Sequence, residues 1–74
     1  IEEVTLGARG SLVGAQIKDN RIRQELGVIV VAVRKPSGEM QFNPTPDTTL
    51  GVGDVVIALG HKDQLARLEN LARA

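Results

Sequence analysis

Residues 43–60 read NPTPDTTLGVGDVVIALG and carry the clearest structural signal in the chain. The first twelve hold two prolines, which fix φ and lack an N–H, and two glycines, which permit positive φ. Asp and Thr side chains in this segment can hydrogen-bond the local backbone. Residues 55–59 then form a short continuous apolar run, typical of a strand buried on both faces. The stretch therefore predicts a rigid turn that leads into an interior strand.

A second apolar run lies upstream, at residues 28–33, VIVVAV, and gives the strongest strand signal in the chain. Pro36-Ser37-Gly38 predicts the hairpin turn that follows it. Beyond that turn, Met40 and Phe42 alternate with polar residues, which predicts a strand with one solvated, polar face. These residues and the stretch at 43–60 therefore predict three consecutive antiparallel strands.

The two ends of the chain add one strand and three helical segments. Residues 4–6 predict a short first strand, and two short helical turns are expected after it, the first capped by Ser11 and the second ended by Gly27. Residues 62–73 predict an amphipathic helix whose apolar stripe contains Leu65 and Leu68. The expected fold class is α+β, a small mostly antiparallel sheet with the order β-αα-β-β-β-α.

The length of 74 residues predicts a single domain, residues 1–74, and the start at Ile1 indicates a piece excised from a longer protein. A core of this size is marginal without association or covalent staples. One helix and two helical turns can cover only one face of the sheet, although two strands are apolar on both faces. The other face is expected to pack on another copy or a partner domain, and a homodimer is favoured.

Composition excludes several functions. Nine basic and nine acidic residues cancel, and Phe42 is the only aromatic residue, so no nucleic-acid partner is expected. The chain has no cysteine and therefore neither disulfides nor thiolate metal ligands. No apolar run is long enough to span a membrane, and Glu2 and Glu3 argue against a signal peptide.

Few residues could carry chemistry. His61 is the only histidine, and no nucleophile is paired with a base, so neither a catalytic site nor a metal site is predicted. Asp47 and Asp54 are expected to stabilise the turn, the alternative being a cation bound between copies. Arg21 and Arg23 precede the strand at 28–33, where an arginine could hold a phosphate; the alternative is a solvated helix face.

The order of these motifs resembles a known family. Ser11-Leu12-Val13-Gly14, Ile22-Arg23, residues 27–33, Asn43-Pro44 and Gly53-Asp54 together resemble the C-terminal lobe of RCK domains (regulators of K+ conductance), also called the TrkA C-terminal domain. The resemblance covers essentially the whole chain. It implies a non-catalytic regulatory and dimerisation module of a K+ or other ion transport protein. The expected location is cytoplasmic, at the inner face of the cell membrane, and the expected partners are a transporter or channel and an RCK N-terminal nucleotide-binding lobe.

The resemblance also implies a ligand site in a cleft between two copies. Some family members bind cyclic di-AMP there through an Ile-Arg pair, which Ile22-Arg23 matches, and the implied site residues are Ile22, Arg23, Ile29 and Val30. This chain departs from the binders at two positions: Ile29 replaces an asparagine and Arg21 an acidic residue. These departures remove polar contacts to the base and ribose of cyclic di-AMP, whereas the matched Arg23 favours an anionic ligand, either a cyclic dinucleotide or another. The alternative is a purely structural dimerisation domain with no ligand of its own.

Overall fold

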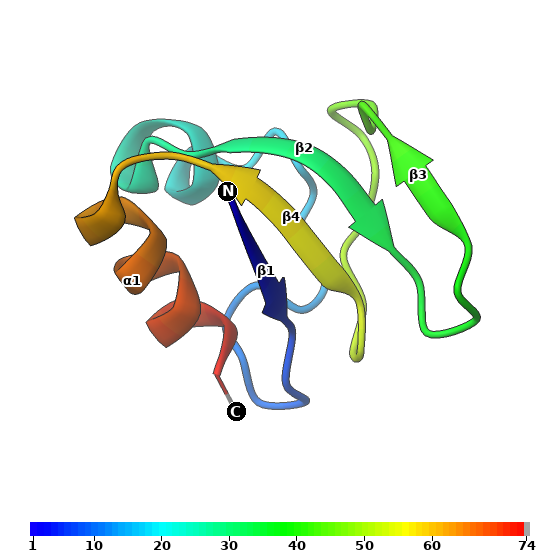
Figure 1. Ribbon diagram of the computed structural model, residues 1–74. Helices are drawn as coiled ribbons and strands as arrows, with labels where there is room; N and C mark the ends of the chain where they lie inside the picture. The colour runs from blue at the N-terminus through cyan, green and yellow to red at the C-terminus, as the bar shows by residue number, and fades with distance from the viewer. Residues whose placement is uncertain (74) are drawn as a thin grey trace.

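The computed structural model describes residues 1–73 and shows four antiparallel strands beside one α-helix. The strands are β1 (Glu2–Thr5), β2 (Ile29–Arg34), β3 (Met40–Phe42) and β4 (Val55–Leu59). They lie in the order β1-β4-β2-β3 (Figure 1). A π-helical turn, η1 (Arg21–Leu26), precedes β2, and α1 (Lys62–Ala72) closes the chain. The predicted α+β class and strand order along the chain are confirmed.

The turn before β4 is built around the carboxylate of Asp54, which is 2% exposed. Its Oδ2 accepts hydrogen bonds from the Gly51 N–H and from Lys35 Nζ, each at 2.8 Å. The Asp54 carbonyl oxygen accepts a hydrogen bond from the Leu6 N–H, and the Leu6 carbonyl oxygen accepts one from the Gly53 N–H, both at 2.9 Å. The turn is thereby joined to the segment after β1 and to the end of β2. Asp54 therefore stabilises the turn, as predicted, and it also forms an ion pair with Lys35, which the sequence did not predict.

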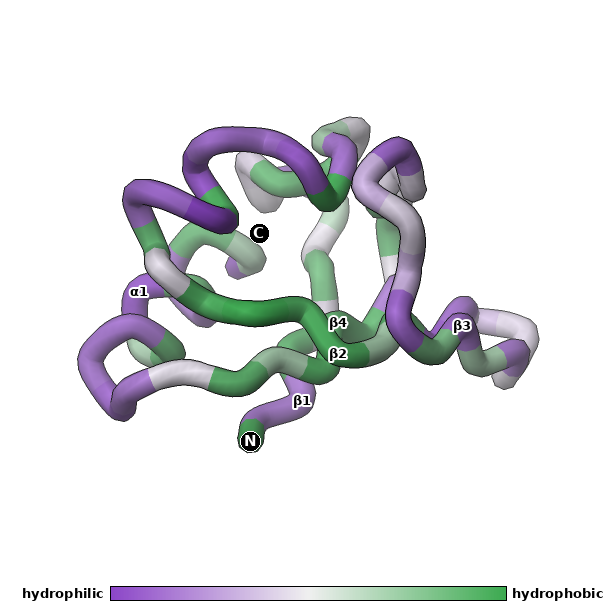
Figure 2. Tube along the Cα trace, turned by 90° about the horizontal axis from the view of Figure 1, so that it is seen from above, coloured by the Kyte–Doolittle hydropathy of each residue, from purple (hydrophilic) through white to green (hydrophobic). Residues whose placement is uncertain are grey.

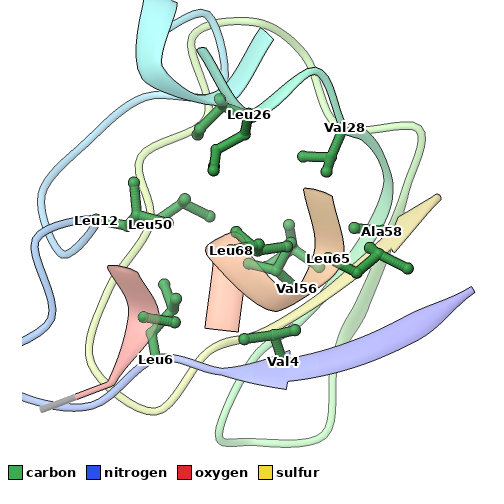
Figure 3. Close-up of a cluster of buried hydrophobic side chains, with 13 residues drawn as sticks. Val4, Leu6, Leu12, Leu26, Val28, Leu50, Val56, Ala58, Leu65 and Leu68 are labelled. Carbon is green, nitrogen blue, oxygen red and sulfur yellow. The ribbon is translucent and has the colours of Figure 1, made fainter. Parts of the chain in front are cut away.

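The core lies between the sheet and α1 (Figure 3). Val56 and Ala58 of β4 pack in one cluster with Leu65 and Leu68 of α1. The rest of the cluster comes from the other strands, η1 and the loops, including Val4, Leu6, Leu12, Ile22, Leu26, Val28, Val33 and Leu50. Burial of these leucines and valines contributes roughly 1.5–3 kcal/mol per side chain, which is what orders so short a chain. The predicted stripe of α1 therefore faces the core.

The segment after β1 differs from its prediction. Residues 11–17 form turns, not a helix, because their backbone groups bond to residues 48–50. The Gly14 N–H donates to the Leu50 carbonyl at 2.8 Å, and the Ile17 N–H donates to the Thr48 carbonyl at 3.0 Å. Gly14 also has φ 87°, a left-handed conformation that interrupts a right-handed helix. The second predicted turn exists as η1, and Gly27 ends it at φ 73°, as expected.

The opposite side of the sheet, here called the outer face, is not covered by any element of residues 1–73. Side chains alternate along a strand, so Val55, Ile57 and Leu59 point away from the core. Ile57 lies opposite Ala32, and Ala32 lies opposite Phe42 in the neighbouring strand. Figure 2 colours β2 and β4 as hydrophobic because the residues on both faces of these strands are apolar. The two apolar strands are thus buried on one face and partly open on the other.

Phe42 corrects the expected orientation of β3. The alternation is as predicted, but Gln41 lies opposite the buried Val33, whereas Phe42 is 77% exposed on the outer face. The apolar side of β3 is therefore the side that one chain leaves open. The apolar residues on this side of β3 fit an outer face that is covered when chains associate.

Candidate functional site

A pocket opens where η1, the start of β2 and the loop after β3 meet. It encloses about 250 Å³, and its polar lining consists of Lys18, Arg23 and Asn43. The remaining lining residues are apolar: Ile17, Ile22, Val28, Ile29, Val30, Pro44 and Pro46. Two cationic side chains and no carboxylate line the pocket, which favours an anionic ligand with apolar parts.

The four residues implied by the family resemblance all line this pocket. Ile22 and Arg23 come from η1, and Ile29 and Val30 come from the start of β2. Gly27, in the left-handed conformation, reverses the chain between the two elements and brings them together. Ile22 is 2% exposed and forms the pocket floor, whereas Ile29 is 62% exposed at its rim.

The two arginines of η1 have different environments. Arg21 is held by Asp19, to whose carboxylate its Nε and Nη2 donate at 3.0 Å, and its Nη1 donates to the Ser11 carbonyl. The hydrogen bonds that the Arg21 side chain and backbone N–H donate to the Asp19 carboxylate lower the pKa of Asp19. The Arg23 backbone N–H donates to the Asp19 carbonyl, but the exposed Arg23 side chain has no hydrogen bond or ion pair within residues 1–73. Arg23 is therefore the arginine available to a ligand.

The sequence did not indicate the two further polar lining residues, Lys18 and Asn43. Lys18 lies between the two predicted helical turns, and its backbone N–H donates to the Pro46 carbonyl at 2.9 Å. Asn43 has φ 47°, and its N–H donates to the Val31 carbonyl at 2.9 Å. For Asn43 the sequence holds one indication: the residue begins the Asn-Pro-Thr-Pro run, and asparagine tolerates the left-handed backbone conformation that such turns use. The turn borders the pocket through its two prolines.

The other polar candidates have structural surroundings. Asp47 forms an exposed ion pair with Lys18 at 3.0 Å, and Asp54 forms the buried pair with Lys35. His61 precedes α1, and its N–H donates to Gln64 Oε1 at 2.8 Å, which caps the helix. Within residues 1–73 no group of three or more His, Cys, Asp or Glu side chains gathers to hold a metal ion. Nor does any helix in this part of the chain have the length and hydropathy of a membrane span.

An exposed apolar patch adjoins the pocket on the outer face. It consists of the exposed Ile29, Phe42 and Leu59 with the half-buried Ile57; Ile29 is also a rim residue of the pocket. Ile29 and Leu59 lie directly opposite each other on β2 and β4, and Leu59 is 45% exposed. An ion pair between Arg34 Nη2 and Glu3 Oε1, at 2.9 Å, lies on the same face. Such a patch with a charged border is typical of an association surface.

Comparison with known proteins gives one consistent result. The sequence matches the TrkA-C domain over residues 1–73. Potassium channel protein 1 of Methanocaldococcus jannaschii is 38% identical over 53 residues, which are 72% of this chain but only 16% of that protein. The chain therefore spans about a sixth of that curated relative.

Solved structures agree with the sequence match. The RCK C domain of the potassium transport protein KtrA, in complex with cyclic di-AMP, has a TM-score of 0.76 and 32% identity, covering 93% of this chain and 80% of that one. The RCK_C domain dimer of Streptococcus agalactiae BusR with cyclic di-AMP has a TM-score of 0.84 and 21% identity, covering 95% and 91%. At that identity BusR shows the fold alone.

The fold and the sequence match define the class: the C-terminal domain of RCK proteins, the regulators of K+ conductance. The chain belongs to the TrkA-C domain family, and the predicted family is confirmed. BusR has also been solved with promoter DNA, a partner that belongs to that regulator. The expectation that this chain binds no nucleic acid stays a prediction.

Proposed function

We propose that this chain is a non-catalytic regulatory lobe of a potassium or other ion transport protein, and that it binds an anionic ligand, foremost a cyclic dinucleotide. The observation that carries the proposal is the pocket in which the exposed Arg23, without an ion pair, stands against an apolar wall. An arginine free of protein partners can bind a phosphate in a bidentate manner. The complex of KtrA with cyclic di-AMP supports this ligand class.

Two copies would complete the site. The pocket of about 250 Å³ is smaller than the roughly 300–1,000 Å³ of sites that hold a whole drug-sized ligand. A second chain packed over the apolar patch would bring its own pocket close, because Ile29 belongs to both the patch and the pocket. A two-fold symmetric ligand would then meet Arg23 from each chain. The dimeric BusR domain, with its bound cyclic di-AMP, supports this arrangement.

The mechanism would be a population shift. A ligand that contacts both copies favours the relative orientation in which the two pockets face each other. That orientation would be transmitted to a nucleotide-binding lobe and a transporter or channel in the full-length protein, at the cytoplasmic side of the membrane. The potassium channel protein of M. jannaschii, with which this chain shares 38% identity, supports such a context.

Thermal unfolding with and without cyclic di-AMP tests the proposal. At ten times Kd a ligand stabilises the folded state by about 1.4 kcal/mol, which for a domain of this size raises Tm by roughly 6–11 °C. Arg23→Ala should remove the rise, whereas Arg67→Ala, an exposed arginine of α1 outside the pocket, should keep it. A rise that survives Arg23→Ala would contradict the assigned site.

A purely structural dimerisation domain is the second candidate, favoured by the apolar patch itself. It predicts association of the chain without any ligand and no Tm shift with cyclic dinucleotides, mononucleotides or divalent cations. Binding by the wild-type chain that depends on Arg23 would exclude it.

A further inference from the structure

We propose that Asp47 is a built-in competitor for the ligand: it pairs with Lys18, a residue of the pocket lining, until a bound anion takes its place. The inference rests on the proposed function, since it concerns how the same pocket is regulated. Lys18 lines the pocket, but its Nζ is bound to Asp47 Oδ1 at 3.0 Å. Asp47 itself is not a lining residue, so the ion pair ties a cation of the pocket to a carboxylate that does not belong to the lining.

The backbone holds the two partners in place while their side chains stay free to move. The Lys18 N–H donates to the Pro46 carbonyl at 2.9 Å, and Gln16 Nε2 donates to the Asp47 carbonyl at 3.2 Å. The Lys18 and Asp47 side chains are 56% and 75% exposed, respectively. A long, solvated lysine side chain can change rotamer without disturbing this backbone. The ammonium group can therefore exchange between the Asp47 carboxylate and a bound anion.

Lys18 leaves Asp47 only when a bound anion offers it another negative charge. Arg23 has no ion pair within residues 1–73, whereas Lys18 has one. A ligand with one anionic group would be held by Arg23 alone, and a ligand with a second anionic oxygen within reach would also recruit Lys18. Exposed ion pairs of this kind contribute little free energy, so the competition is weak enough for a ligand to overcome.

A double-mutant cycle on the chain measures this competition. Asp47→Asn keeps the shape of the side chain and removes its charge, and Lys18→Met keeps most of the stem and removes the ammonium. Calorimetric titrations with two probes, cyclic di-AMP and inorganic pyrophosphate, would be run at low salt on the wild type, both single variants and the double variant. Thermal unfolding of each variant without ligand verifies that it is folded.

The expected result is that Asp47→Asn tightens binding about two- to five-fold. Lys18→Met weakens binding, and Asp47→Asn has no further effect in the Lys18→Met background. A gain that persists in that background would mean that Asp47 acts through space on the ligand, which overturns the inference. An unchanged affinity of Asp47→Asn, or no binding of either probe by any variant, would overturn it too.

The two probes separate this inference from the proposed function. If pyrophosphate binds with the expected coupling and cyclic di-AMP does not bind, the proposed ligand is wrong and the competition stands. If cyclic di-AMP binds through Arg23 without any coupling between positions 18 and 47, the proposed function stands and the competition is wrong.

Discussion

The buried ion pair between Lys35 and Asp54 gives the sharpest stability prediction. The Asp54 side chain is 3% exposed, that of Lys35 is 27% exposed, and Nζ lies 2.8 Å from Oδ2. Lys35→Met would leave a buried carboxylate with the Gly51 N–H as its remaining side-chain hydrogen bond. Removing one partner of a fully buried pair costs about 3–5 kcal/mol. Because Lys35 is partly solvated, we expect a loss of roughly 2–3 kcal/mol, out of about 4–11 kcal/mol for a domain of this length.

The complementary change should be less costly. In Asp54→Asn an amide oxygen can still accept the Gly51 N–H, and the partly exposed Lys35 can turn to water, so the expected loss is about 1 kcal/mol. The double variant buries no charge and should cost less than the sum of the single variants, with a coupling of about 1–2 kcal/mol. Lys62→Met, an exposed lysine at the start of α1, is the control and should change stability by less than about 0.5 kcal/mol.

Urea unfolding at one fixed protein concentration is the assay, because association would make the stability concentration-dependent. Two results would contradict this prediction: a loss of stability for Asp54→Asn larger than that for Lys35→Met, or strict additivity in the double variant. Either would show that the carboxylate does not depend on the lysine for its burial.

Three further predictions follow from other parts of the molecule. Phe42→Ser should weaken self-association, seen by sedimentation, and leave the fold intact, whereas Val52→Ser, at an exposed valine outside the sheet, should not. Gly10→Ala should lower the free energy of unfolding by about 1–3 kcal/mol in urea, because its Cβ would overlap the Ala72 carbonyl oxygen; unchanged stability would contradict that packing. Arg21→Leu should raise the pKa of Asp19, measured by NMR, because the hydrogen bonds that lower it come from Arg21. The stability from this lowered pKa is present above the unfolded value and is lost as pH falls through the folded one, so the variant should lose less stability on acidification; an unshifted Asp19 pKa would contradict this.

The fold could be predicted where short apolar runs are bounded by glycine and proline. Residues 55–59 and the leucine stripe of α1 are found where their patterns predict them, since burial of a continuous run leaves few alternatives. The segment at 11–17 could not be predicted, because its conformation is set by hydrogen bonds to residues 48–50, more than thirty residues away. Local signals such as Ser11 carry no information about that pairing.

The residues of the pocket were predictable only in part, again because some of them come from segments that are distant in the chain. Ile22, Arg23, Ile29 and Val30, which the family pattern implied, lie close together in the chain, and all four line the pocket; that they bind a ligand stays a prediction. Lys18 and Asn43 belong to segments that only the folded chain brings together, so their place in the pocket could not be predicted. The orientation of Phe42 was wrong because an alternating strand does not say which of its faces one chain covers.

The stoichiometry of ligand binding decides whether two copies form one site. In a calorimetric titration of the wild-type chain with cyclic di-AMP, we predict one ligand per two chains, and sedimentation in its presence should show the dimer. One ligand per chain with a monomeric protein, or no heat of binding at concentrations that saturate the KtrA domain, would contradict it.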